Sequence, residues 1–308
     1  RNPILDGYFG EYFYCKSETL NFIKSNTSKK LAIILDEKNV TVQNIDELLD
    51  PCKGIIDMVR IAIDPSNFDR AINLAKIIKQ KGFEIAFNLM YMSNWDKFPN
   101  LIENFVQLND LVNYLYLVDS FGGVFPDEVR STIRKTRKAT TVKLGFHGHN
   151  NLEMALANTL IAIEEGIDII DATVTGMGRG AGNLKTELLL TTLDHKFGFD
   201  LNYDALSNIT GKFQDLQQNY KWGTSLPYMV SGAKSLPQKQ VMEWVNKRYY
   251  SMNSITRAIN NKTVTNNFKN FDFDLNFDSV VIVGGGGSVF NHKKPILDFL
   301  NPVTILYV

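Results

Sequence analysis

The 308-residue chain is long enough for one large α/β domain and a smaller additional one. Its charges balance, with 33 lysines and arginines against 33 aspartates and glutamates, so no net field favours nucleic acid or an anionic membrane surface as a partner. Cys15 and Cys52 form no CxxC pair, and the sequence shows neither an apolar run of roughly 18 residues nor the apolar core of a signal peptide. These features predict a cytoplasmic protein whose partner is a small molecule or another protein.

Apolar runs and amphipathic segments alternate through the first two thirds of the chain. The runs begin about 27 residues apart, which is the length of one strand, one helix and two loops in a parallel α/β unit. Between them, 68–80 and 152–165 each carry an apolar stripe of helical period. Six such units suit an open doubly wound sheet or part of a closed eight-stranded barrel. The predicted strands are 31–35, 58–63, 84–90, 114–118, 142–146 and 167–174.

This alternation stops after Phe199. Residues 203–220 and 239–250 are predicted helices, joined by the aromatic segment KWGTSLPYM, and they suit a cover over the α/β domain or a contact between two copies of the chain. Residues 268–277 read as a polar linker, followed by a strand, a glycine loop, a helix and another strand. We therefore expect an α/β domain at 1–200, a helical extension at 201–266, and a linker with the start of a second, Rossmann-like α/β domain at 267–308.

Two histidines lie at the end of the fifth predicted strand. Residues two apart in a strand point to the same side, so His147 and His149 can converge on one ion. The alternative is a pair of polar residues at a strand end. Asn183 follows the glycine-dense loop 176–182 and is a candidate further ligand, although an asparagine there could instead cap a helix that begins at Leu184. Imidazoles joined by oxygen ligands suit manganese or magnesium.

Polar residues also mark the neighbouring strands. Asp119 and Ser120, in YLVDSFGG, end the fourth predicted strand, and we interpret Asp119 as a functional carboxylate rather than a cap of the next turn. Arg60, in MVRIAI, lies in an apolar strand, so it must pair with Asp119 or a neighbouring carboxylate, or bind an anionic substrate. Asn88, in AFNLM, can face inward by the same reasoning.

The glycines of the loop 176–182 have two interpretations. Gly178 and Gly180 could help to hold a phosphate or carboxylate group, or they could simply permit a tight turn with positive φ angles. Their spacing does not match GxGxxG, so it does not indicate a nucleotide.

The block GFHGHNNLEMALANTLIAIEEGIDIIDATVTGMGRGAGN closely resembles the signature of the DRE-TIM metallolyase superfamily, which includes 4-hydroxy-2-oxovalerate aldolase, hydroxymethylglutaryl-CoA lyase, and the isopropylmalate and homocitrate synthases. YLVDSFGG and MVRIAI fall where this family has its sixth and fourth strands, so the resemblance covers about residues 20–200. It implies a TIM (β/α)8-type barrel whose first two βα units precede Arg1. It also implies metal contacts at His147, His149 and Asn183, while the family's first-strand arginine–aspartate pair has no counterpart here.

The resemblance implies a divalent-metal-dependent aldolase, most like 4-hydroxy-2-oxovalerate aldolase, that acts on a 2-oxo acid and an aldehyde through an enolate, with Mn²⁺ or Mg²⁺ as cofactor. The absence of a cysteine from GMGRGAGN argues against hydroxymethylglutaryl-CoA lyase activity. Alternatives are an acyl-CoA-dependent Claisen-type synthase and a non-catalytic barrel scaffold, and the helical extension is expected to join copies of the chain. The implied catalytic residues are Arg60, Asp119 and Ser120, and the implied substrate contacts are Asn88, Gly178 and Gly180.

Overall fold

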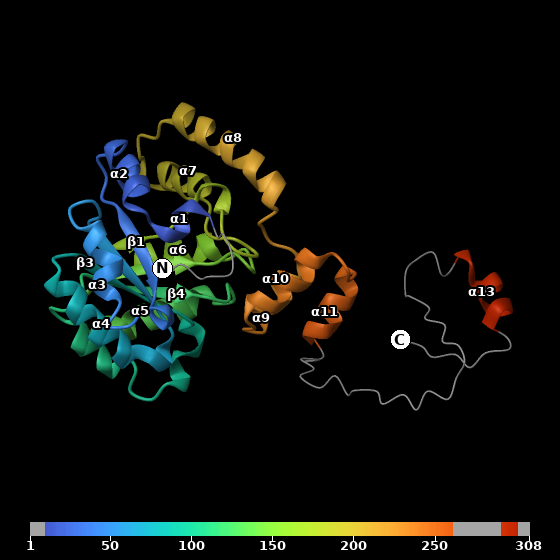
Figure 1. Cartoon of the computed structure of the whole chain (residues 1–308), viewed down its shortest axis with the longest axis horizontal. Helices are drawn as coiled ribbons and strands as arrows, with labels where there is room; N and C mark the ends of the chain where they lie inside the picture. The colour runs from blue at the N-terminus through green and yellow to red at the C-terminus, as the bar shows by residue number, and fades with distance from the viewer. Residues whose placement is uncertain (1–9, 261–290, 301–308) are drawn as a thin grey trace. The chain divides into compact units, whose positions relative to one another are not determined.

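The computed structural model describes residues 10–260 and 291–300 (Figure 1). The chain divides into two units, residues 1–263 and 264–308. Within the second unit only helix α13 (Lys293–Leu300) and the two residues before it are described. The predicted linker and the glycine loop and strands of the Rossmann-like fragment lie outside the described residues.

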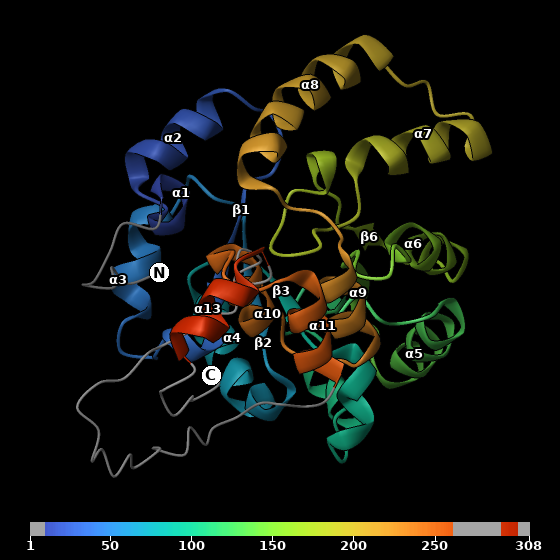
Figure 2. The ribbon, with the colours of Figure 1, turned by 90° about the vertical axis from the view of Figure 1, so that its right-hand side faces the viewer.

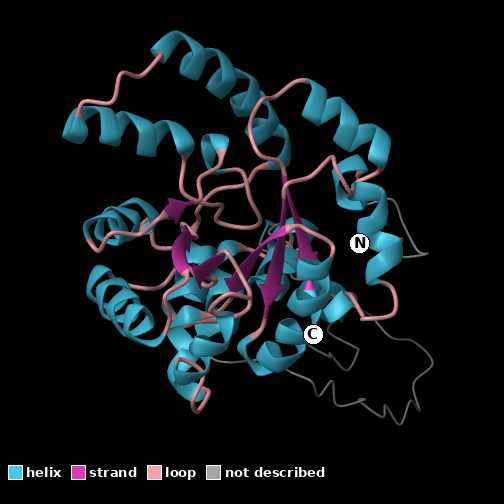
Figure 3. Cartoon of the chain, turned by 90° about the vertical axis from the view of Figure 1, so that its left-hand side faces the viewer, coloured by secondary structure: helices cyan, strands magenta, loops and turns pink. Residues whose placement is uncertain are grey.

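One parallel sheet forms the centre of the first unit (Figure 3). Its strand order follows the chain, so each strand pairs with the next one in sequence. A doubly wound sheet reverses direction at a switch point, whereas a barrel adds its strands in order, and the order here is that of a barrel. Among the described residues, β1 and β6 have no strand on their outer edges. The strands are β1 (Ala32–Asp36), β2 (Met58–Ile63), β3 (Glu84–Leu89), β4 (Tyr114–Asp119), β5 (Lys143–Gly148) and β6 (Ile169–Ile170).

All six strands lie where the apolar runs predict them, but β6 is much shorter than expected. Only Ile169 and Ile170 pair with β5, opposite Gly145 and Phe146. The rest of the predicted strand 167–174 leaves the sheet and enters the short 3-10 helix η6 (Val174–Gly176), where Thr175 has a φ of 53°. An apolar run indicates burial rather than pairing, and residues 169–174 are partly buried although, beyond Ile170, only Thr173 makes a bridge to a described residue, Lys185.

Helices and 3-10 turns connect successive strands and cover the outer face of the sheet. The stripe predicted in 68–80 is confirmed in α4, which buries Ala71, Ile72 and Leu74 against the sheet. The helix predicted over 152–165 begins later, at Ala155. The connecting helices are α3 (Ile45–Leu49), α4 (Phe68–Gln80), α5 (Pro126–Ala139) and α6 (Ala155–Glu164), and the 3-10 turns are η1 (Glu37–Asn39), η2 (Asp50–Cys52), η3 (Pro65–Asn67), η4 (Met92–Lys97) and η5 (Glu103–Leu108).

The inner face of the sheet has a small apolar cluster of its own. Met58, Ala86, Tyr116 and Val118 are buried together there. Gly145 makes room for this cluster, because a Cβ at that position would lie 2.5 Å from the Tyr116 ring. Further along the strands, towards their carboxyl ends, the inner face becomes polar.

Two sets of helices complete the first unit. α1 (Glu11–Tyr14) and α2 (Ser17–Ser25) precede β1. After the sheet come α7 (Thr186–Phe197), α8 (Tyr203–Tyr220), α9 (Leu226–Ala233), α10 (Gln238–Lys247) and α11 (Met252–Asn260). The predicted helix 203–220 is confirmed in α8, and α9, α10 and α11 lie together, apart from α8 (Figure 1, Figure 2). No helix among the described residues is long and apolar enough to cross a membrane.

Helices α9 to α11 pack around a core that includes one residue from outside them. Tyr228, Val241, Ile255 and Ile259 are buried together with Ala181. Because Ala181 belongs to the glycine-dense loop, this helical group is fastened to the loop that follows β6.

Candidate active site

Arg60 forms the centre of a polar cluster on the inner face. Its guanidinium makes two hydrogen bonds to the Asp171 carboxylate, Nη1 to Oδ1 at 2.9 Å and Nη2 to Oδ2 at 2.5 Å. Nε donates to Oδ1 of Asn88 at 3.0 Å, and the guanidinium lies 3.9 Å from the centre of the Tyr116 ring. The expected carboxylate partner of Arg60 is therefore present, but it is Asp171 rather than Asp119.

Asp171 also orients His147. Its Oδ2 lies 2.7 Å from Nδ1 of His147. Burial would raise the pKa of Asp171, but the hydrogen bonds from His147 and Arg60 outweigh burial and hold this pKa at about 2. The ionised carboxylate accepts a hydrogen bond from Nδ1, so in the neutral imidazole the lone pair of His147 is on Nε2.

The sequence reasoning missed Asp171. It lies in GIDIID, inside the predicted strand 167–174, and directly follows the observed strand β6. A carboxylate within an apolar run was therefore a usable signal, because a buried charge needs a partner, as Arg60 does.

His149 is fixed by the backbone rather than by a carboxylate. Its Nδ1 lies 2.7 Å from the carbonyl oxygen of Asp119, which can only accept, so Nδ1 carries the proton and Nε2 the lone pair. Burial, with a contribution from the nearby His147, lowers the pKa of His149 to about 3, so the ring is neutral. The two rings lie side by side, with centroids 4.9 Å apart. Within residues 10–260 and 291–300, neither Nε2 has a hydrogen-bond partner.

Asn183 lies next to His149 because the two residues form an antiparallel bridge. Its Nδ2 donates to the carbonyl oxygen of Met177 at 3.0 Å, which closes the glycine-dense loop and leaves Oδ1 available. The alternative role as a helix cap is wrong, since α7 begins at Thr186 and Lys185 occupies the cap position. Asn183 therefore supplies an oxygen atom from the loop beside the histidine pair.

Gly178 and Gly180 are enclosed by neighbouring side chains. A Cβ at Gly178 would lie 2.7 Å from Nδ2 of Asn183, and a Cβ at Gly180 would collide with Oε1 of Gln238. Gly180 also has a φ of +60°, which residues other than glycine rarely adopt. A side chain at either position would therefore have to displace Asn183 or Gln238.

Asp119 and Ser120 hold the turns around the site. The Asp119 carboxylate is buried and accepts hydrogen bonds from the backbone N–H groups of Gly123 and Val124, each at 3.3 Å. Burial raises its pKa to about 6, against the effect of those hydrogen bonds. Oγ of Ser120 accepts a hydrogen bond from the backbone N–H of Tyr91 at 2.8 Å. The Asp119 side chain thus takes the position of a turn cap, while its carbonyl group orients His149.

Asn151, two residues after His149, joins the barrel to the helical extension. Its side chain is fully buried, and its Nδ2 donates to the carbonyl oxygen of Tyr228 at 2.9 Å. Its Oδ1 accepts a hydrogen bond from Nε2 of Gln238 at 2.6 Å. The same Gln238 side chain contacts Gly180, so a single residue of α10 reaches both the turn after His149 and the glycine loop.

The segment between α8 and α9 contacts the same loop. Nε1 of Trp222 donates to the carbonyl oxygen of Thr175 at 3.1 Å, and the backbone N–H of Gly223 donates to the carbonyl oxygen of Gly180 at 3.0 Å. These contacts, with those of Asn151 and Gln238, hold the loop in place from outside the barrel. These contacts agree with the prediction that the extension covers the α/β domain, although the sequence pattern did not indicate which residues make them.

The arrangement suits a metal ion only in part. The two imidazole rings lie 4.9 Å apart, Asn183 is bridged to His149, and both histidines are oriented through Nδ1 with Nε2 left unbonded by any described residue, an arrangement common in metal-binding histidines. Among the described residues there is no group of three or more histidine, cysteine, aspartate or glutamate side chains that could hold a metal ion. A metal ion held by His147, His149 and Asn183 would therefore need further oxygen ligands.

This chain is similar to several known enzymes. It matches the model of the HMGL-like family over residues 58–211, half of the chain. A 4-hydroxy-2-oxovalerate aldolase from Geobacillus thermodenitrificans is 34% identical over 207 residues, which cover 64% of this chain and 59% of that enzyme. An oxaloacetate decarboxylase from Mycobacterium tuberculosis is 34% identical over 152 residues, 49% of this chain and 45% of that enzyme. The chain thus spans about half the length of these curated relatives.

Solved structures agree with the fold. The N-terminal domain of a protein assigned as an aldolase from Bacteroides vulgatus is 49% identical, with a TM-score of 0.79 and coverage of 84% of this chain and 85% of that one. An HMG-CoA lyase from Brucella melitensis has a TM-score of 0.55 at 19% identity, covering 66% of this chain and 79% of that one, which supports the fold alone.

Proposed function

Because this chain belongs to the HMGL-like family, we propose that it is a divalent-metal-dependent aldolase, which makes or breaks a carbon–carbon bond next to a 2-oxo acid. The observation that carries the proposal is the histidine pair. Each ring is held at Nδ1 by a hydrogen bond of 2.7 Å, and the ring centroids lie 4.9 Å apart, so Nδ1 of each ring is occupied and Nε2 is the nitrogen left for a metal ion. We assign His147, His149 and Asn183 as the residues that hold Mn²⁺ or Mg²⁺.

A bound divalent ion would supply Lewis-acid stabilisation of the negative charge that develops on the 2-oxo acid. The chain's own residues orient and support this centre. Asp171 keeps His147 in the tautomer that binds metal, and Arg60 balances the charge of Asp171. Because both hydrogen-bonding edges of Arg60 are occupied by Asp171 and Asn88, we assign Arg60 to positioning rather than to direct substrate binding.

The predicted catalytic residues Asp119 and Ser120 have a similar role in this proposal. Asp119 orients His149 through its carbonyl group, and Ser120 fixes the backbone at Tyr91, after β3. Gly178 and Gly180 bring the loop close to Asn183, and Asn88 occupies the inner face beside Arg60. The substrate is proposed to be a small 2-oxo acid with an aldehyde as its partner, in a cytoplasmic enzyme.

Self-association through the helical extension is a separate part of the proposal. Helix α8 buries none of its residues and exposes Ile209 and Leu216. Sedimentation velocity on the wild type and on Ile209→Glu tests this role, since a contact through α8 requires the variant to sediment as a smaller species.

The metal site is tested by Mn²⁺ titration of the full chain, with free Mn²⁺ measured by electron paramagnetic resonance. We expect His147→Ala and His149→Ala to weaken binding by more than about tenfold, because each removes a ligand. His195→Ala, in α7, is the control and should bind as the wild type does. Unchanged Mn²⁺ affinity in both ligand variants overturns the proposal.

Activity is tested with pyruvate as the simplest 2-oxo acid. An enzyme that stabilises an enolate exchanges the methyl hydrogens of pyruvate for deuterium in the presence of Mn²⁺, and proton nuclear magnetic resonance detects the loss of the methyl signal. Thiol release from acetyl-CoA in the presence of a 2-oxo acid, without aldol cleavage, identifies a Claisen-type synthase instead. Neither reaction is expected of a scaffold.

A further inference from the structure

The tip of the glycine loop carries hydrogen-bond donors that the protein itself does not use. In the part of the chain that the structure describes, the backbone N–H groups of residues 178–181 donate no hydrogen bond. Gly180 and Ala181 are nevertheless buried residues. Buried N–H groups in native proteins nearly always have an acceptor. Successive free N–H groups in a tight loop provide a site for an anion.

Arg179 lies in the middle of this loop segment. Its side chain is exposed, and no residue in 10–260 or 291–300 forms a hydrogen bond or ion pair with its guanidinium. Arg179 precedes Asn183 by four residues, and the bridge between Asn183 and His149 holds this end of the loop beside the histidine pair.

Arg60 and Arg179 differ in what they can offer a substrate. The charge of Arg60 is compensated by the two hydrogen bonds to Asp171. Arg179 has no such partner among the described residues, and its planar group can form paired hydrogen bonds with a carboxylate or a phosphate. Of these two cations, Arg179 is the one available to an anionic ligand.

The loop is also held where it can contact a substrate bound at the histidine pair. The bridge between His149 and Asn183 ties its far end to the histidines, and the hydrogen bond from Gly223 to Gly180 ties its tip to the extension. Ala181 is packed into the core of α9 to α11. A donor set fixed in this way loses little freedom when it binds an anion.

We propose that Arg179 and the backbone N–H groups of residues 178–181 bind a second anionic group of the substrate, remote from its 2-oxo acid end. The preferred substrate is then a 2-oxo acid that carries a second carboxylate or a phosphoryl-type group. This inference rests on the proposed aldolase site for the placement of the 2-oxo end.

Two matched pairs of ligands test the inference by isothermal titration calorimetry on the full chain with Mn²⁺. In the first pair, 2-oxoglutarate has a carboxylate where 2-oxovalerate has a methyl group. In the second pair, 3-phosphonopyruvate has a phosphonate where 2-oxobutyrate has a methyl group. We expect the dianionic member of at least one pair to bind the wild type about tenfold or more tightly than its partner, and the pair that responds identifies the anion.

Arg179→Met should reduce this preference to less than about twofold, because it removes the charge but keeps an unbranched side chain. Arg179→Lys should retain part of it, since lysine keeps the charge without the paired donors. Lys185→Met removes another exposed positive charge close by in the sequence and should leave the preference unchanged.

Equal binding of both members in both pairs by the wild type overturns the inference, as does an unchanged preference in Arg179→Met. These outcomes are separate from those of the aldolase proposal. If pyruvate exchanges its methyl hydrogens but no dianion is preferred, only the anion site is wrong. If the preference depends on Arg179 but pyruvate does not exchange, the anion site stands and the aldolase proposal is wrong.

Discussion

The two halves of the candidate site are built by different interactions. His147 lies on β5 and is held by the ionised side chain of Asp171, which Arg60 neutralises. His149 lies just beyond β5 and is held by a backbone carbonyl group, in a region fixed by amide hydrogen bonds to the helical extension. The strand-built half therefore depends on charge, and the loop-built half depends on shape and on uncharged hydrogen bonds.

The largest expected effect is that of Asp171→Asn, which breaks the strand-built half. The Arg60 side chain is only 14% exposed and would lose its counter-charge, so we expect the free energy of unfolding to fall by about 3 kcal/mol. The variant should also bind Mn²⁺ about 10–100-fold more weakly, because His147 loses its orienting carboxylate. Urea unfolding and Mn²⁺ titration measure the two effects.

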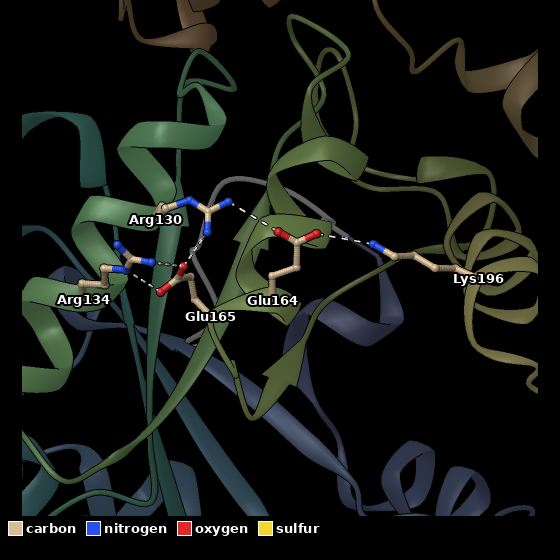
Figure 4. A network of polar contacts seen from close by, with 5 residues as sticks. All are labelled: Arg130, Arg134, Glu164, Glu165 and Lys196. Carbon is tan, nitrogen blue, oxygen red and sulfur yellow. Dashed lines mark hydrogen bonds and ion pairs between the residues drawn. The ribbon is translucent and has the colours of Figure 1, made fainter.

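The control for this variant is a surface ion network between α5, α6 and α7 (Figure 4). Arg130 and Arg134 both bind Glu165, and Glu164 lies 3.4 Å from both Arg130 and Lys196. Glu164 is 45% exposed, so Glu164→Gln should change the free energy of unfolding by less than about 1 kcal/mol. Equal destabilisation by the two variants contradicts a special role for the buried pair.

Asn151→Ala breaks the loop-built half. The Tyr228 carbonyl group loses a donor and the Gln238 amide loses its acceptor in a fully buried place, so we expect a loss of about 2 kcal/mol in the free energy of unfolding. Limited proteolysis should also cut faster within residues 222–238, since the extension loses this anchor. Asn150→Ala is the matched control. Equal rates of proteolysis in the two variants would contradict the claim that the Asn151 side chain anchors the extension.

Gly180→Ala tests the close approach of α10 to the loop. The substitution meets both an unfavourable positive φ and a collision with Gln238, and we expect it to cost about 1–2 kcal/mol. Gly198→Ala is the control, because Gly198 has a similar φ of +70° but open space around it and should show the backbone cost alone. In a double-mutant cycle, Gly180→Ala should cost less in a Gln238→Ala background than in the wild type, because the collision is then absent. An equal cost in both backgrounds would mean that the collision does not contribute to stability.

The smallest effect is expected of Trp222→Phe. The change keeps an aromatic ring but removes the hydrogen bond from Nε1 to the carbonyl oxygen of Thr175, so it should cost about 1 kcal/mol in urea unfolding. Trp244→Phe is the control, since Trp244 packs in the core of the extension and its indole has no hydrogen bond to another described residue. A larger loss of unfolding free energy in Trp244→Phe would mean that packing, rather than the hydrogen bond of Trp222, determines the effect.

The sequence alone determined the elements and the placement of the histidines. Apolar runs located all six strands, because a buried parallel strand needs apolar residues on both faces. The stripe in 68–80 located α4, and the spacing of His147 and His149 correctly put both rings side by side. These features depend on the local geometry of the chain, so the pattern of nearby residues was sufficient.

Only the tertiary structure decided which residues support the site. Arg60 and Asp171 are 111 positions apart and meet because β2 and β6 direct their side chains into the same interior. The sequence also could not separate a helix cap from a loop bridge at Asn183, because both roles favour asparagine and the choice depends on where α7 begins. Asn151 and Gln238 meet for the same reason: sheet order and helix packing set contacts between distant residues, and no local periodicity encodes them.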